Sequence, residues 1–107
     1  MEESAFNALA EVELERIEAA LEACGAELDI ENKPGGILEV EFDNASKLII
    51  NRHTAAREIW VAAKSGGFHF RHADGQWVSA RDGIELYALL SRVVTEQSGQ
   101  PVTLQRD

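Results

Sequence analysis

The sequence contains no long hydrophobic run and only one cysteine. Apolar runs such as LII and YALL fall far below the roughly 20 residues that a membrane-spanning helix needs, and the opening residues MEESAF lack the basic start and apolar stretch of a signal peptide. Cys24 has no second cysteine with which to form a disulfide or share a zinc ion, so it suits a reducing compartment. These absences argue against a membrane protein and a disulfide-stabilised secreted domain, and they predict a cytoplasmic location.

Basic residues are scarce in the first part of the chain. The sequence of 107 residues has a formal net charge of −9, and residues 1–43 contain thirteen acidic residues but only Arg16 and Lys33 as bases. Residues 44–107 are nearly balanced, with eight bases and six acids. A field of this sign repels nucleic acids and anionic lipid surfaces, and it attracts cations and basic protein surfaces. We therefore expect no nucleic-acid or membrane partner, and a chain of this length is expected to form a single domain over residues 1–107.

Residues 4–24 have the spacing of an amphipathic helix, with Ser4 available as the N-cap and Gly25 just past the expected end. Its apolar positions recur at steps of three and four residues: Phe6, Ala10, Leu14, Ile17, Leu21 and Cys24. At about 100° per residue, four glutamates fall within a wedge of roughly 60° beside this apolar stripe. This column of carboxylates comprises Glu11, Glu15, Glu18 and Glu22.

The middle of the chain alternates between apolar and polar residues in short stretches that are separated by turn residues. The pattern predicts an antiparallel meander of about six strands, at residues 27–31, 37–43, 47–52, 58–64, 68–71 and 76–79. A second helix is predicted at residues 82–98, with Asp82 and Glu85 as a capping box, and the tail at 102–104 is expected to add a short strand or to fill the gap between the helices. Because each strand is apolar on one side only, the predicted fold class is α+β: a two-layer sandwich with two helices packed on one face of the sheet.

The stretch EIWVAAK, residues 58–64, places a tryptophan on the polar side of its strand. The indole of Trp60 is therefore expected to be exposed on the open face of the sheet. An exposed tryptophan on such a face is typical of a protein-binding anchor. The alternative is that the ring lies flat against the methylene groups of Lys64 or Arg71. Trp77, by contrast, is on the apolar side of its hairpin and is predicted to lie in the core.

No catalytic motif stands out from the chain. The sequence contains neither G-x-S-x-G nor a Walker A motif, and Cys24 ends an amphipathic helix without a histidine partner. The three histidines, His53, His69 and His72, give no preformed transition-metal site, and each is either an isolated ligand or a plain surface residue. His69 is expected to point outward on the same sheet face as Trp60.

The stretch INRHTAAREIWVAAKSGGFHF, followed by DGQW and ARDGIELYALL, resembles the frataxin family, and specifically its bacterial branch. The similarity extends over nearly the whole chain. The resemblance implies the two-helix, antiparallel-sheet sandwich that was derived above. It also implies weak binding of ferrous and ferric iron through acidic residues, and docking on the cysteine desulfurase and the scaffold protein that build iron–sulfur clusters.

The family's acidic ridge and partner-binding residues can be carried over to this chain position by position. The resemblance implies that the acidic ridge comprises Glu11, Glu15, Glu18, Glu22, Asp29 and Glu31. It implies that Trp60 and Asn51 contact the partner, next to Glu18 and Glu22. There are departures, because positions 19 and 23–25 lack acids or a tryptophan that bacterial relatives often have, and His53 stands where glutamine is common.

The charge pattern and the resemblance together favour an iron-binding adaptor or regulator of iron–sulfur cluster assembly rather than an enzyme. Carboxylate oxygens accept iron and other divalent cations without strong selection, and exposed carboxylates form no closed coordination sphere, so iron binding should be weak. We expect a monomer that forms oligomers only with excess iron. The alternatives are an acidic iron-storage or ferroxidase-type protein, or a glutamate column that is simply a solvated helix face.

Overall fold

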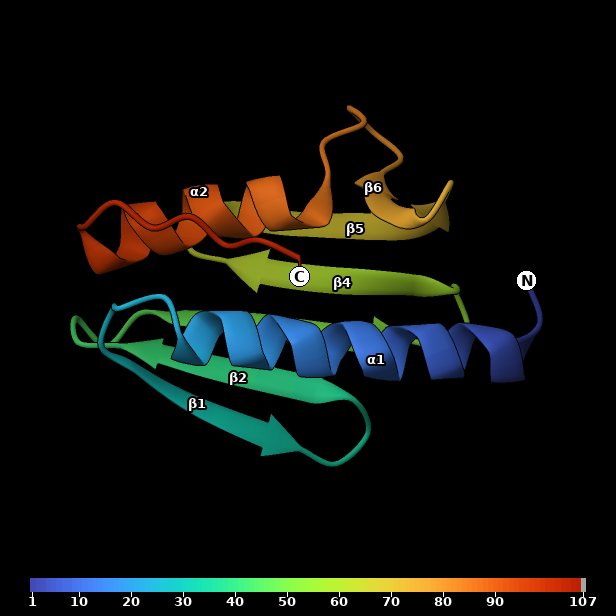
Figure 1. The fold of residues 1–107 in the computed structure, drawn as a ribbon, viewed down its shortest axis with the longest axis horizontal. Coiled ribbons are helices and arrows are strands. Elements are labelled where there is room, and N and C mark those ends of the chain that lie inside the picture. Colours follow the sequence, from blue (N-terminus) through green and yellow to red (C-terminus); the bar gives the residue numbers. More distant parts are fainter. Residues whose placement is uncertain (107) are drawn as a thin grey trace.

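The computed structural model describes residues 1–106. A long helix is followed by six strands and a second helix, in the order that the sequence predicts (Figure 1). The elements are α1 (Glu3–Glu22), β1 (Leu28–Lys33), β2 (Ile37–Phe42), β3 (Lys47–His53), β4 (Glu58–Ala63), β5 (Gly66–Ala73), β6 (Gln76–Ser79) and α2 (Leu86–Ser98).

The six strands form one antiparallel sheet in which each strand pairs with the next one along the chain. In Figure 1, α1 runs along the half of the sheet that contains β1, β2 and β3, and α2 lies over the half that contains β5 and β6. Each helix buries one apolar stripe in a single core with the inward-facing residues of the strands. The α+β two-layer prediction is therefore confirmed, and the opposite face of the sheet is left open.

Helix α1 is held to the sheet by the apolar residues that its sequence spacing predicts. Phe6, Ile17 and Leu21 are almost completely buried in the core. The predicted N-cap is wrong: the helix begins at Glu3, its N-cap is Glu2, and Ser4 lies in the first turn. Because Glu2 makes no side-chain capping bond, packing of the apolar stripe stabilises this end of the helix rather than a cap.

Helix α2 begins at Leu86, four residues later than predicted. The side chain of Glu85 caps it by accepting hydrogen bonds from the backbone N–H groups of Tyr87 and Ala88. Asp82 does not cap the helix, since its carboxylate accepts a bond from the N–H of Ile84 at 3.2 Å. The capping-box prediction is therefore wrong.

The tail after α2 fills the space beside the helices and forms no strand within the described residues. Val102 and Leu104 are buried in the core. Their backbone N–H groups donate to the hydroxyls of Thr95 and Ser91, at 3.0 and 2.8 Å, so the extended tail satisfies its polar groups on α2.

Trp77 is 2% exposed, which confirms its predicted place in the core. Within residues 1–106, no helix is both long and apolar enough to cross a membrane.

A buried polar contact joins α1, α2 and the tail. The carboxylate of Glu13 is only 2% exposed and accepts a hydrogen bond from the hydroxyl of Tyr87. The guanidinium of Arg106 lies 3.4 Å from the same carboxylate, and that of Arg16 lies 4.0 Å from it. Burial, followed by the bond to the Glu13 carboxylate, raises the pKa of the Tyr87 hydroxyl far above its usual range.

This raised pKa predicts that the protein loses stability in strong alkali. Above about pH 10, the unfolded chain releases the tyrosine proton while the native state keeps it, so the free energy of unfolding should fall by about 1.4 kcal/mol per pH unit. Tyr87 is the only tyrosine, so its ionisation can be followed by tyrosinate absorbance. The absorbance should rise at the pH at which circular dichroism reports unfolding. Ionisation near pH 10 with the fold intact would contradict the prediction.

Candidate functional site: an acidic ridge and the Trp60 face

The four glutamates of the acidic ridge on α1 lie beside the edge strand β1. Glu11, Glu15 and Glu22 are exposed and Glu18 is half-buried. The side-chain amide of Asn32, near the end of β1, donates a hydrogen bond of 3.0 Å to the carboxylate of Glu18. This contact links the side of α1 that carries the glutamates to the edge of the sheet.

The two acids of β1 lie on the other side of that strand. Leu28 and Ile30 pack against the core, so the alternating residues Asp29 and Glu31 point to the open sheet face, where both are exposed. The acidic ridge therefore has two parts at one edge of the sheet: the glutamate column on α1 and the β1 acids on the open face.

Like charges also face one another across β1 and β2. In the strand register, Asp29 is opposite Glu41 and Glu31 is opposite Glu39. Glu39 is neutralised by Lys33 at 3.2 Å and by Lys47 at 3.6 Å. A hydrogen bond from Lys33 lowers the pKa of the Glu39 carboxyl below its ordinary value. Glu39 is therefore paired, and the negative charge of this face is concentrated on Asp29, Glu31 and Glu41.

Glu11 differs from the rest of the acidic ridge because a base neutralises it. The guanidinium of Arg52 lies 2.9 Å from the carboxylate of Glu11. Arg52 is two residues beyond Ile50 and four beyond Leu48 on β3, so its side chain shares their face and points toward the helix layer. The alternation of apolar and polar residues in the sequence of β3 carries this signal. Glu11 is consequently the ridge residue least available to a cation.

The acidic ridge is an open surface rather than a preformed metal centre. Among residues 1–106, no three side chains of histidine, cysteine, aspartate or glutamate are grouped so that they could hold one metal ion together. The carboxylates can offer single or paired oxygen ligands to a hydrated cation. Such an arrangement fits a loosely held cation, and it does not fit a closed site that binds one metal selectively.

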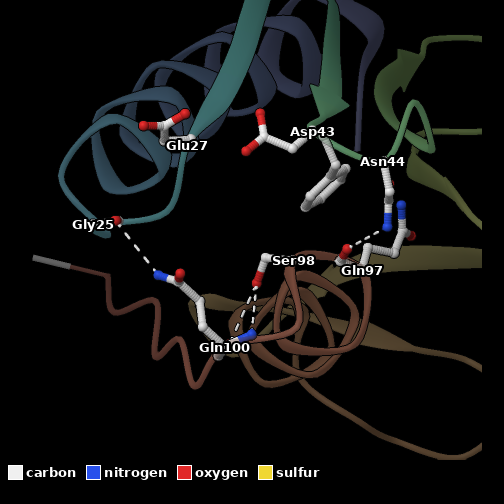
Figure 2. A pocket seen from close by; sticks show the side chains of 8 residues that line it. Gly25, Glu27, Asp43, Asn44, Gln97, Ser98 and Gln100 are labelled. Carbon is white, nitrogen blue, oxygen red and sulfur yellow. Dashed lines mark hydrogen bonds between the residues drawn. The ribbon is translucent and has the colours of Figure 1, made fainter.

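A pocket of about 460 Å³ extends the acidic edge toward the end of α2 (Figure 2). Its walls include Glu27 before β1, Asp43 after β2 and the residues that end α2. The side chain of Gln100 donates a 3.4 Å bond to the carbonyl of Gly25 and closes one side of the pocket. Glu27 and Asp43 are acids that the predicted ridge did not include, and they lie at the β1–β2 end where the net charge is negative.

Trp60 is on the open face of the sheet, as predicted, but it is not fully exposed. The ring is half-buried and is stacked between two imidazoles, that of His53 at 3.7 Å and that of His69 at 4.3 Å between centroids. The interplanar angles are 15° and 9°. The indole N–H donates a 2.8 Å hydrogen bond to the carboxylate of Glu58. The expected uncovered indole is therefore wrong, and the covering groups are the histidines rather than Lys64 or Arg71.

The strand register explains this arrangement. Asn51 on β3, Trp60 on β4 and His69 on β5 are directly opposite one another, so their side chains form one row across the open face. His53 is opposite Glu58 in the next row. Asn51 is half-buried beside Trp60, and its side-chain amide lies 3.4 Å from the carbonyl oxygen of Arg52. The two partner-binding candidates are thus neighbours on one surface.

These features define an acidic α+β sandwich that offers an open sheet face and a charged edge. Residues 1–100 match the frataxin-like domain family. The chain is 55% identical over 104 residues to the protein of Dechloromonas aromatica that is called iron-sulfur cluster assembly protein CyaY, and the match covers 97% of this chain and 99% of that protein. The chain therefore belongs to the frataxin family, in its bacterial branch.

Solved structures agree with this assignment. Frataxin from Psychromonas ingrahamii superposes with a TM-score of 0.89 at 33% identity, covering 98% of this chain and 99% of that one. Trimeric frataxin from the yeast Saccharomyces cerevisiae superposes with a TM-score of 0.67 at 26% identity, covering 94% of this chain and 88% of that one. Its crystal structure is described as complexed with ferrous. The fold and the family that the sequence predicts are confirmed.

Proposed function

We propose that this protein is an iron-binding adaptor that regulates iron–sulfur cluster assembly. The observation that carries the proposal is the placement of an acidic ridge at one edge of the sheet, next to an open face that has an aromatic residue at its centre. The bacterial relative is named for iron–sulfur cluster assembly, which supports the proposed role in assembly. The yeast structure is described as complexed with ferrous, which supports the proposed binding of iron. The protein acts by binding, without catalysing a reaction.

The acidic ridge holds iron as a cargo. Glu15, Glu18, Glu22, Asp29 and Glu31 supply carboxylate oxygens, while Glu11 contributes least because of its pair with Arg52. Open carboxylate sites give weak binding that salt screens strongly and that other divalent cations share. Both ferrous and ferric iron suit these ligands. Weak binding suits delivery or sensing of iron, because the ion must leave again.

The partner is a cysteine desulfurase together with its scaffold protein. A basic patch on the desulfurase meets the acidic ridge at Glu18 and Glu22, and Trp60 with Asn51 contacts the junction between desulfurase and scaffold. Iron on the ridge reduces its negative charge, so iron and the partner affect each other's binding reciprocally. The adaptor works as a cytoplasmic monomer, in a reducing compartment that suits its single cysteine.

Iron binding can be tested by titrating ferrous iron anaerobically into the ¹⁵N-labelled protein. Paramagnetic line broadening is expected first at Glu15, Glu18, Glu22, Asp29 and Glu31, and it should be weaker at Glu11. Glu96, which is exposed on α2, serves as a matched glutamate outside the ridge. Replacing Glu18 and Glu22 with glutamine should weaken the broadening of their neighbours several-fold, whereas Glu96→Gln should not change it.

Equal broadening at Glu96 and at the ridge would contradict the proposed iron site.

The alternative functions can be tested on the same sample. A ferroxidase would consume oxygen over many turnovers when air is admitted, and a storage protein would elute as a large assembly in gel filtration with excess iron. An adaptor should do neither at stoichiometric iron.

A further inference from the structure

The two histidines that sandwich Trp60 are held differently. The Nδ1 atom of His53 accepts a hydrogen bond of 3.3 Å from the backbone N–H of Ala56 in the β3–β4 turn. This contact fixes the orientation of the imidazole ring. His53 therefore forms a fixed wall on one face of the indole.

His69 covers the other face of the indole and has no comparable backbone contact among the described residues. Its side chain is 55% exposed, and its Nδ1 atom lies 3.7 Å from the carboxylate of Glu58. That carboxylate is only 13% exposed and also accepts the indole N–H of Trp60. Protonation of His69 therefore places a positive charge between an aromatic face and a partly buried carboxylate, and both attract it.

The other charged groups around His69 do not remove this attraction. Arg71, on the same strand, lies with its guanidinium 3.6 Å from Glu58 and is 67% exposed, so solvent screens much of its charge. Arg81, which follows β6, shares a shallow depression with His69 and Glu58 and donates to the carbonyl of Gly67 at 3.4 Å. His53 faces the opposite side of the indole. Glu58 is the only carboxylate within ion-pair distance of His69 among residues 1–106.

We propose that His69 is a proton-controlled lid over Trp60. The neutral imidazole, held by stacking alone, swings aside and leaves one face of the indole free to be covered by a docking partner. The imidazolium is held closed by the indole and by Glu58, and its charge also repels a basic partner. Because Trp60 is the anchor in the proposed function, on which this inference rests, docking should weaken as the pH falls through the range in which histidine gains a proton, about pH 5 to 8.

Tryptophan fluorescence tests the lid without any partner. Subtracting the emission of the Trp60→Phe variant from that of the native protein isolates Trp60, because Trp77 and its neighbour His72 are common to both. The Trp60 emission should fall between pH 8 and pH 5 as the protonated imidazole closes on the ring. The change should be lost in His69→Gln, which cannot gain a proton, and kept in His53→Gln. A flat Trp60 signal, or an unchanged titration in His69→Gln, would overturn the lid.

A docking measurement with purified cysteine desulfurase tests the consequence. The affinity of the native protein is expected to be roughly tenfold weaker at pH 5.5 than at pH 8, whereas His69→Gln should change less than about twofold. Any titration of the acidic ridge or of the desulfurase affects both proteins equally and cancels in this comparison. The same tenfold change in His69→Gln would overturn the lid as a regulator. Absence of docking at every pH would instead overturn the proposed function, and the fluorescence titration would then decide on the lid by itself.

Discussion

Replacement of Tyr87 with phenylalanine is expected to lower the free energy of unfolding by about 1.5–3 kcal/mol. The substitution removes a hydroxyl that donates to the buried carboxylate of Glu13, and a hydrogen bond to a buried charged group is worth about 1.5–3 kcal/mol. The remaining partners, Arg106 and Arg16, are each more than a third exposed and cannot replace the lost donor. The loss is therefore electrostatic, since the aromatic ring and its packing stay the same.

Urea denaturation at pH 7 measures the effect. Glu13→Gln is the matched control, because its side-chain carbonyl can still accept the Tyr87 hydroxyl, and it should cost less than Tyr87→Phe. The double variant Glu13→Leu, Tyr87→Phe removes both polar partners and should recover part of the loss. If Tyr87→Phe is as stable as the native protein, the contact contributes nothing and the burial of Glu13 needs another explanation.

The sequence predicted the layers of the fold because each element repeats a simple period. Residues two apart on a strand, such as Leu48 and Ile50, share one face and are buried in the core. Residues three or four apart on α2, such as Leu86, Leu89 and Leu90, are likewise buried on one face of the helix. These patterns depend only on the geometry of a strand or a helix. Their repetition along the chain was sufficient to place both helices on one face of the sheet.

The beginning of α2 could not be predicted in the same way. Asp82 and Glu85 have the spacing of a capping box, but the backbone of residues 79–84 is held by other contacts. The N–H of Ser79 donates to the carbonyl of Ile84 at 2.9 Å, and the N–H of Gly83 donates to that of Ser79 at 2.8 Å. This loop delays the helix until Leu86. The capping-box pattern was therefore overridden by backbone contacts that form only when the end of β6 is folded.

The residues of the candidate site could be predicted from the sequence. The contacts that cover or neutralise some of them could not. Alternation placed Trp60 on the open face, but covering of its ring by His53 and His69 depends on the register of three strands. The pairing of Glu11 with Arg52 likewise joins residues that are far apart in the sequence. The sequence therefore indicates which groups are present, whereas pairing and stacking determine which of them are available to a ligand.

The largest functional effect is expected from Trp60→Ala, which should weaken the proposed docking on a cysteine desulfurase by about thirtyfold or more. An aromatic anchor at the centre of an interface typically contributes 2 kcal/mol or more, and 1.4 kcal/mol corresponds to a factor of ten in affinity. Trp60 is the large aromatic residue in the row of the open face that also contains Asn51 and His69. The loss should appear mainly in the dissociation rate, because the charged ridge that steers association is unchanged.

Surface plasmon resonance at constant salt and pH 8 separates this effect from a general loss of apolar surface. Val12→Ala is the control, since Val12 is 47% exposed on α1 and lies outside the open sheet face. It should dock like the native protein, and circular dichroism should show that Trp60→Ala remains folded, because the core on the other side of the sheet is untouched. Equal dissociation rates for Trp60→Ala and Val12→Ala would mean that the open face is not the docking surface. The acidic ridge would then have to bind the desulfurase alone, and the affinity of every variant should fall steeply with added salt.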